Sequence, residues 1–189
     1  MISCTLCSRG KAGDVTQATS ESEACKSCLP STYAAYSGSS QCALCPPGSF
    51  CPDSGMSDPD ACSAGKFAVL KGSLFCDDCP AGRFQSQAGE AMCDLCAAGK
   101  YNVMNGSSSG SDCQLCPTGT ATYMPGYPVC IDCGRYAYTE GVGSSVCFEC
   151  PKHGQVSNEE GNGCVIDTIL QGPSLMDEIY ENGTALVGA

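Results

Sequence analysis

The stretch that decides the fold is Cys76-Asp77-Asp78-Cys79-Pro80-Ala81-Gly82-Arg83-Phe84. It joins a C-x-x-C pair to a turn containing proline and glycine, and then to an aromatic residue. Proline presets φ and glycine supplies a positive φ, so the stretch predicts a tight turn that leads into a short strand. A second glycine, Gly89, lies shortly before the next cysteine, Cys93, and predicts the return turn of a small hairpin.

The same arrangement recurs about every 17 residues along the chain. Counted from the second cysteine of each pair, most units have glycine three residues on, an aromatic five on and glycine ten on. Nine units begin at Cys7, Cys28, Cys45, Cys62, Cys79, Cys96, Cys116, Cys133 and Cys150. Because three residue types keep one register, we predict a linear array over residues 1–164, made of about nine β-hairpin-like cysteine-rich repeats. We expect little regular secondary structure and the shape of an elongated rod.

The composition places the chain in the small disulfide-rich class. Nineteen of its 189 residues are cysteine, and there is no tryptophan. This cysteine content indicates a disulfide scaffold, since a unit this small cannot bury enough apolar surface to fold alone. We expect the aromatic residue to be the only large buried side chain of each unit. Disulfides persist in oxidising compartments, so we expect an extracellular or cell-surface protein.

Charge and motifs exclude several function classes. The chain has 20 acidic and 9 basic residues, a net charge of -11, which argues against nucleic acid as a partner. No apolar run approaches the roughly 20 residues that span a bilayer, so we expect no transmembrane segment in this chain. The single histidine, His153, lies in a polar turn. Because no catalytic motif is present, we expect no enzymatic role and no cofactor.

The disulfides follow from the repeat if each opening cysteine pairs with the closing cysteine of its own unit. This scheme predicts Cys7–Cys25, Cys28–Cys42, Cys62–Cys76, Cys79–Cys93, Cys96–Cys113, Cys116–Cys130, Cys133–Cys147 and Cys150–Cys164. Closing a loop of this size contributes about 3 kcal/mol per bridge in the chain-entropy model. Nine such bridges could exceed the small core as the source of stability.

The third unit and the first cysteine need separate treatment. Pro59 stands where the third unit should close, and the same unit has an extra cysteine, Cys51. We therefore predict Cys45–Cys51. The rival scheme is Cys45–Cys62 together with Cys51–Cys76. Cys4 is left over; its register predicts a natural chain that continues upstream, and an intermolecular disulfide is the alternative.

Metal binding is the rival chemistry for these cysteines. C-x-x-C turns are also the knuckles of Cys4 zinc sites, so an intracellular zinc protein is a remote alternative. Zinc would leave Cys51, Cys62 and Cys164 without a role. An acidic series inside the C-x-x-C links offers weak Ca²⁺ candidates, at Asp77, Asp78, Asp94, Asp132 and Glu149. The simpler interpretation of this series is a solvated, repulsive surface.

Two sequons and a distinct tail complete the chain. Asn105-Gly106-Ser107 and Asn182-Gly183-Thr184 predict N-linked glycans, and Asn105 lies where the sixth unit is enlarged by a serine-rich loop. Residues 165–189 contain no cysteine. We expect a short strand over 165–170 and a helix starting near Ser174, in a tail that either links to another domain or docks on another repeat or subunit.

The string Cys76–Phe84 and its repeats resemble the ephrin-receptor-like cysteine-rich repeats found in long extracellular arrays. They also resemble the first half of a tumour-necrosis-factor-receptor cysteine-rich domain. The resemblance covers about residues 4–164 and implies the same pairing of opening and closing cysteines. The second half of that receptor domain is missing, so its ligand binding does not carry over to this chain.

Two function hypotheses follow. The first is a structural glycoprotein of the cell surface or an appendage, a stalk or filament subunit whose partners are copies of itself. The alternative is a receptor or adhesion ectodomain that binds a protein ligand. A fold of this kind specifies an architecture and not a ligand.

Overall fold

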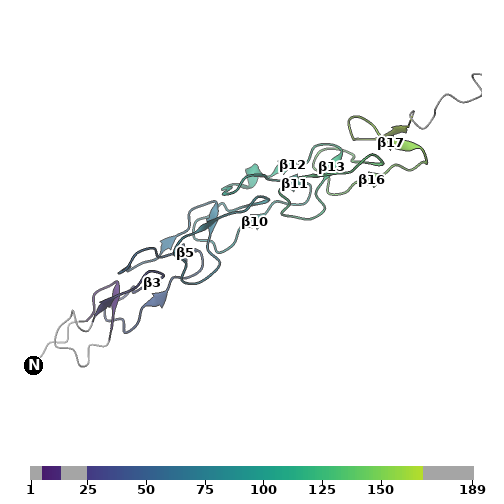
Figure 1. Ribbon diagram of the computed structural model, residues 1–189. Helices are drawn as coiled ribbons and strands as arrows, with labels where there is room; N and C mark the ends of the chain where they lie inside the picture. Colours follow the sequence, from purple (N-terminus) through teal and green to yellow (C-terminus); the bar gives the residue numbers. More distant parts are fainter. Residues whose placement is uncertain (1–5, 14–24, 168–189) are drawn as a thin grey trace, which may run out of the picture.

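The computed structural model describes residues 6–13 and 25–167. Figure 1 shows small antiparallel hairpins that follow one another along a narrow rod. The predicted fold class, a disulfide-rich array of small hairpins with almost no helix, is confirmed. The paired strands are β1 (Lys11–Ala12) with β2 (Lys26–Ser27), β3 (Thr32–Tyr33) with β4 (Ala43–Leu44), β5 (Ser49–Phe50) with β6 (Asp60–Ala61), β7 (Lys66–Phe67) with β8 (Asp77–Asp78), β9 (Arg83–Phe84) with β10 (Asp94–Leu95), β11 (Lys100–Tyr101) with β12 (Gln114–Leu115), β13 (Thr120–Ala121) with β14 (Ile131–Asp132), β15 (Ala137–Tyr138) with β16 (Phe148–Glu149), and β17 (Gln155–Ser157) with β18 (Cys164–Ile166). One 3₁₀ turn, η1 (Gly110–Asp112), accompanies them in the described part of the chain.

The strands occupy the same place in most units. The first strand ends on the aromatic residue, and the second strand is formed by the two residues inside the next C-x-x-C pair. In the fifth unit, for example, Phe84 pairs with Asp94 and Arg83 with Leu95. Both predicted turn glycines of that unit adopt positive φ, 81° at Gly82 and 83° at Gly89. The hairpin expected from the sequence is therefore present, and its return strand is the cysteine link itself.

The buried side chain of each unit is not the one predicted. The aromatic residues are only half-buried: Tyr33, Phe50, Phe67, Phe84, Tyr101 and Tyr138. The residue that follows the aromatic position is buried instead, and it is small or polar: Ala34, Cys51, Ala68, Gln85, Asn102, Thr122 and Thr139. The buried positions of the units are thus occupied by small or polar side chains together with the cysteines. Opening cysteines such as Cys62 and Cys79 are fully buried and form much of this core.

Adjacent units are joined by a repeated set of backbone hydrogen bonds. At the junction of the fifth and sixth units, the Gly82 N–H donates to the Asn102 carbonyl at 2.7 Å. In the opposite direction, the Gly106 N–H donates to the Cys79 carbonyl at 2.7 Å. Equivalent bonds recur at other junctions along the rod. Each unit thereby satisfies backbone groups that a lone hairpin would leave open, which explains why the units stack.

Each unit also touches the next but one. A Cβ added at Gly82 would lie 2.2 Å from the carbonyl oxygen of Gly126, two units away. The same is true of Gly48, where the distance to the Gly89 carbonyl oxygen would be 1.9 Å. Glycine is therefore needed at this position of the unit for two reasons: the backbone has a positive φ, and a side chain would collide with the carbonyl two units away. The second unit has Ser31 at this position, with a φ of 77°, the one non-glycine residue with positive φ in the described ranges.

The last two units depart from the regular pattern. At their first turns the positive-φ glycines are Gly134 and Gly154, and a Cβ added at either would meet no atom within 4 Å. Strand β18 continues past Cys164, so Val165 and Ile166 pair with β17. The carboxylate of Asp167 is buried and accepts a hydrogen bond from Arg135 of the eighth unit. Residues 165–167 thus pack with the ninth unit, while the helix expected near Ser174 lies outside the described residues.

Candidate functional site

The structure joins the cysteines in the nine pairs expected from the repeat. In the described chain these are Cys7–Cys25, Cys28–Cys42, Cys45–Cys51, Cys62–Cys76, Cys79–Cys93, Cys96–Cys113, Cys116–Cys130, Cys133–Cys147 and Cys150–Cys164. The rival scheme for the third unit does not occur. Cys51 occupies the buried position that Ala or Thr takes in other units, which brings it next to Cys45. Cys4 lies outside the described residues.

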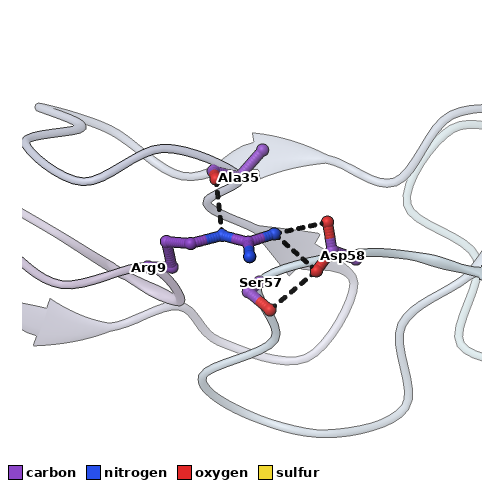
Figure 2. Close-up of polar contacts among 4 residues, drawn as sticks. All are labelled: Arg9, Ala35, Ser57 and Asp58. Atoms are coloured by element: carbon purple, nitrogen blue, oxygen red, sulfur yellow. Dashed lines mark hydrogen bonds and ion pairs between the residues drawn. The ribbon is translucent and has the colours of Figure 1, made fainter.

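The third unit has no disulfide at its closing end, and an ion pair lies there instead. Arg9 of the first unit reaches the carboxylate of Asp58, the residue before Pro59, with contacts of 2.7 Å to both oxygens. Figure 2 shows that the Nε atom of Arg9 also donates to the Ala35 carbonyl, at 2.8 Å. The Ser57 hydroxyl donates to the same carboxylate at 2.9 Å. One arginine thus links three successive units where the covalent bridge is missing.

The acidic series lies on the return strands. Asp77 and Asp78 form β8, and the other members are found in β10, β14 and β16, all of them exposed: Asp94, Asp132 and Glu149. Asp78 is paired with Lys66 across its hairpin at 2.5 Å. Within residues 6–13 and 25–167, no three or more such side chains gather in a group that could hold a metal ion. The arrangement matches a solvated surface, and Ca²⁺ binding stays an untested hypothesis.

The enlarged loop of the sixth unit is held by contacts within the unit and with the fifth unit. Asn105 is exposed, and its Oδ1 accepts a hydrogen bond from the Ala81 N–H at 2.8 Å. The third sequon residue, Ser107, is buried, and its Oγ accepts a hydrogen bond from Asn102. Gly110 packs against the ring of Phe84. Asn105 therefore stands at the surface on a fixed backbone, while the second sequon, at Asn182, lies outside the described residues.

The sequence analysis missed an exposed apolar hairpin in the fourth unit. Residues 69–75, called the apolar hairpin below, have four large apolar side chains with high exposed fractions: Val69 53%, Leu70 73%, Leu74 46% and Phe75 66%. The corresponding positions of the third unit are mostly polar, with Pro52 and Asp53 on one arm and Ser57 and Asp58 on the other. A comparison of units at these positions could have identified the hairpin. Exposed apolar side chains gathered in this way are typical of interaction surfaces.

The backbone of the apolar hairpin is held in place. The Gly72 N–H donates to the Cys45 carbonyl at 2.8 Å, and the Ser73 carbonyl accepts from the Cys51 N–H at 2.9 Å. Across the turn, the Ser73 hydroxyl donates to the Leu70 carbonyl at 2.9 Å. The disulfide Cys62–Cys76 closes the base of the loop. The apolar side chains are therefore displayed from a preorganised backbone.

The single histidine, placed by the sequence in a polar turn, lies at the C-terminal end of the array. His153 is exposed and lines a shallow pocket together with Tyr136 and Lys152. Its imidazole has no hydrogen-bonding partner in the part of the chain that the structure describes. Catalysis by a histidine needs a second group that orients it or a nucleophile within reach. The geometry around His153 offers neither in the described ranges.

The repeat geometry can now be compared with known families. Residues 65–113 match a family model described as tyrosine-protein kinase ephrin type A/B receptor-like. The ephrin-receptor-like segment runs from the turn of the fourth unit to the closing cysteine of the sixth, and it includes the apolar hairpin. The predicted resemblance to these cysteine-rich repeats is thereby confirmed over residues 65–113. Among curated proteins, none matches the chain.

The ephrin-receptor-like match and the disulfides bear on location and role. Both point to an extracellular or secreted protein. No helix in residues 6–13 or 25–167 has the length and hydropathy needed to cross a bilayer. The match favours the receptor or adhesion hypothesis over the filament hypothesis, for which neither the structure nor the comparison offers support. The rod shape does not discriminate between them, because a filament subunit and an ectodomain can both be elongated.

Proposed function

We propose that the chain is part of a receptor or adhesion ectodomain, a stiff non-catalytic array that presents a protein-binding surface at a fixed distance from its attachment. The observation that carries this proposal is the ephrin-receptor-like match over residues 65–113. Stiffness supports it, because backbone hydrogen bonds join adjacent units and close glycine contacts join alternate units. A preorganised surface loses little conformational entropy when it binds a partner.

The expected N-linked glycan at Asn105 fits this proposal. The Nδ2 atom of Asn105, which would carry the sugar, makes no hydrogen bond with a described residue. The Oδ1 atom accepts the hydrogen bond from the Ala81 N–H. A glycan there would project from the sixth unit and leave the junction bond intact. Secreted material should lose one glycan, visible as increased gel mobility, when Asn105→Gln is introduced. Unchanged mobility would remove the glycan from the proposal.

The ectodomain proposal is tested with the full chain, secreted, oxidised and assembled into tetramers on streptavidin. The tetramers are applied to cells that display the secreted and membrane proteins of the organism that makes the chain. We expect binding to a defined protein, and loss of binding after the disulfides are reduced and alkylated. Sedimentation of the unlabelled chain is measured in parallel. Spontaneous growth into long polymers, with no heterologous partner bound, would replace the proposal with the filament hypothesis.

A further inference from the structure

The apolar hairpin differs from the rest of the rod in what it exposes. Other exposed apolar residues occur along the chain, but here four large ones lie within seven residues, on both arms of a single turn. A monomer gains nothing from holding these side chains in water. Their burial against a partner would be favourable, about 25 cal/mol for each Å² of apolar surface removed from water.

Neighbouring units surround the apolar hairpin with acidic groups. The bond from the Cys51 N–H to the Ser73 carbonyl brings the arm containing Asp53 alongside Leu74 and Phe75. On the other side, Glu90 belongs to the fifth unit, which is joined to the fourth by the bond from the Gly89 N–H to the Cys62 carbonyl at 2.8 Å. Asp77 follows the hairpin directly, in β8. The apolar centre therefore has a rim that is mainly negative.

The charge of the surrounding sequence has the same sign. Residues 51–95 contain seven acidic and three basic residues. Of the basic ones, Lys66 is paired with Asp78, and Lys71 stands at the tip of the hairpin. Interfaces place opposite potentials against each other, and charged rims steer association and choose the partner. An acidic rim around an apolar centre is complementary to an apolar anchor flanked by lysine and arginine.

We infer that the apolar hairpin is a docking site for an extracellular protein ligand that presents an apolar anchor residue flanked by basic side chains. This inference rests on the proposed function and names the surface and the chemistry of its partner. Leu70 and Phe75, the two most exposed of the four, serve as the anchors on this side of the interface. Truncation of such central anchors typically weakens binding most.

The test uses the full oxidised chain and a phage-displayed library of random 12-residue peptides as the probe. Peptides are selected on the wild-type chain at low salt and then measured on two variants. The first variant is Leu70→Ser with Phe75→Ser. The control is Leu29→Ser with Tyr36→Ser in the second unit, whose side chains are 72% and 79% exposed. All four residues are exposed, so both variants should keep the wild-type disulfide map.

The expected result is a set of peptides with an aromatic or aliphatic residue between lysines or arginines. Their affinity should fall at least tenfold on the Leu70 and Phe75 variant, stay within twofold on the control, and decrease as salt is raised. Peptides without basic residues, equal binding to both variants, or no enrichment would overturn the inference. So would a concentration-dependent dimer of the wild-type chain that the first variant abolishes, because the occupant would then be a second copy.

Failure here and failure of the proposed function can be separated. If the tetramer experiment finds a protein ligand whose binding is insensitive to Leu70→Ser and Phe75→Ser, the chain is an ectodomain that binds elsewhere. If the tetramers bind no protein at all, the ectodomain proposal itself fails.

Discussion

Replacement of Gly82 by alanine should loosen the contact between alternate units. Gly82 has a φ of 81°, and the added Cβ would lie 2.2 Å from the Gly126 carbonyl oxygen, a backbone atom that cannot rotate away. The left-handed conformation costs a non-glycine residue about 1–2 kcal/mol. Forcing extra atoms into a packed contact costs typically about 1–3 kcal/mol more. We expect a total destabilisation of about 2–5 kcal/mol.

Gly154→Ala is the matched control for this prediction. Gly154 has the same φ of 81°, yet a Cβ there would meet nothing within 4 Å. Alanine at this position should cost only the conformational part, about 1–2 kcal/mol. The difference between the two variants isolates the contribution of stacking between alternate units.

Amide hydrogen exchange of the oxidised chain measures the effect locally. The Gly126 N–H donates to the Cys96 carbonyl at 2.8 Å, so its exchange reports the position of the seventh unit. In Gly82→Ala it should accelerate roughly 30-fold or more, since each 1.4 kcal/mol is a factor of ten. In Gly154→Ala it should stay at the wild-type rate. Equal behaviour of the two variants at this amide would refute the reasoning that alternate units are in tight contact.

Three further variants test other parts of the rod. Ser31→Gly should raise stability in thermal unfolding by about 1 kcal/mol, because serine there holds a positive φ of 77°; a lower melting temperature would contradict this. Arg9→Ala should lower global stability by less than about 1 kcal/mol, since the ion pair with Asp58 is exposed. It should nevertheless speed amide exchange selectively in residues 51–59, and an equal change of exchange along the whole rod would argue against a local role of Arg9 in holding the third unit. Arg135→Ala should destabilise the ninth unit by about 1–3 kcal/mol, because it removes a hydrogen bond to the buried Asp167 carboxylate; unchanged exchange in β17 and β18 would count against that role.

Much of the local structure could be predicted from the sequence because each unit is closed by residues near one another in the chain. Spacing predicted the hairpins and favoured the nine cysteine pairs that the structure joins, including Cys45 with Cys51, for which a rival scheme was open because Pro59 replaces the usual cysteine. The turn glycines, such as Gly82 and Gly89, adopt the positive φ that the sequence predicted. A loop of about fourteen residues between two cysteines leaves few ways to return, so local pattern and local structure agree.

The packing between units could not be predicted in the same way. The sequence suggested that aromatics such as Phe84 fill the interior, whereas the structure buries Gln85 and leaves the ring half-exposed. The second reason for glycine at Gly82, its approach to Gly126, depends on a residue two units away. A comparison of units could have singled out the apolar residues of the fourth unit, but only the structure gives their exposure to solvent.

Taken alone, the sequence determined the repeat, the covalent closure of each unit and the similarity of residues 65–113 to ephrin-receptor-like repeats, since all three depend on short-range spacing. Only the tertiary structure decided which side chain each unit buries, which units touch and which apolar residues remain in water. The physical reason is that those outcomes depend on how rigid hairpins fit against one another, and residue types as different as alanine, glutamine and threonine satisfy the same narrow space.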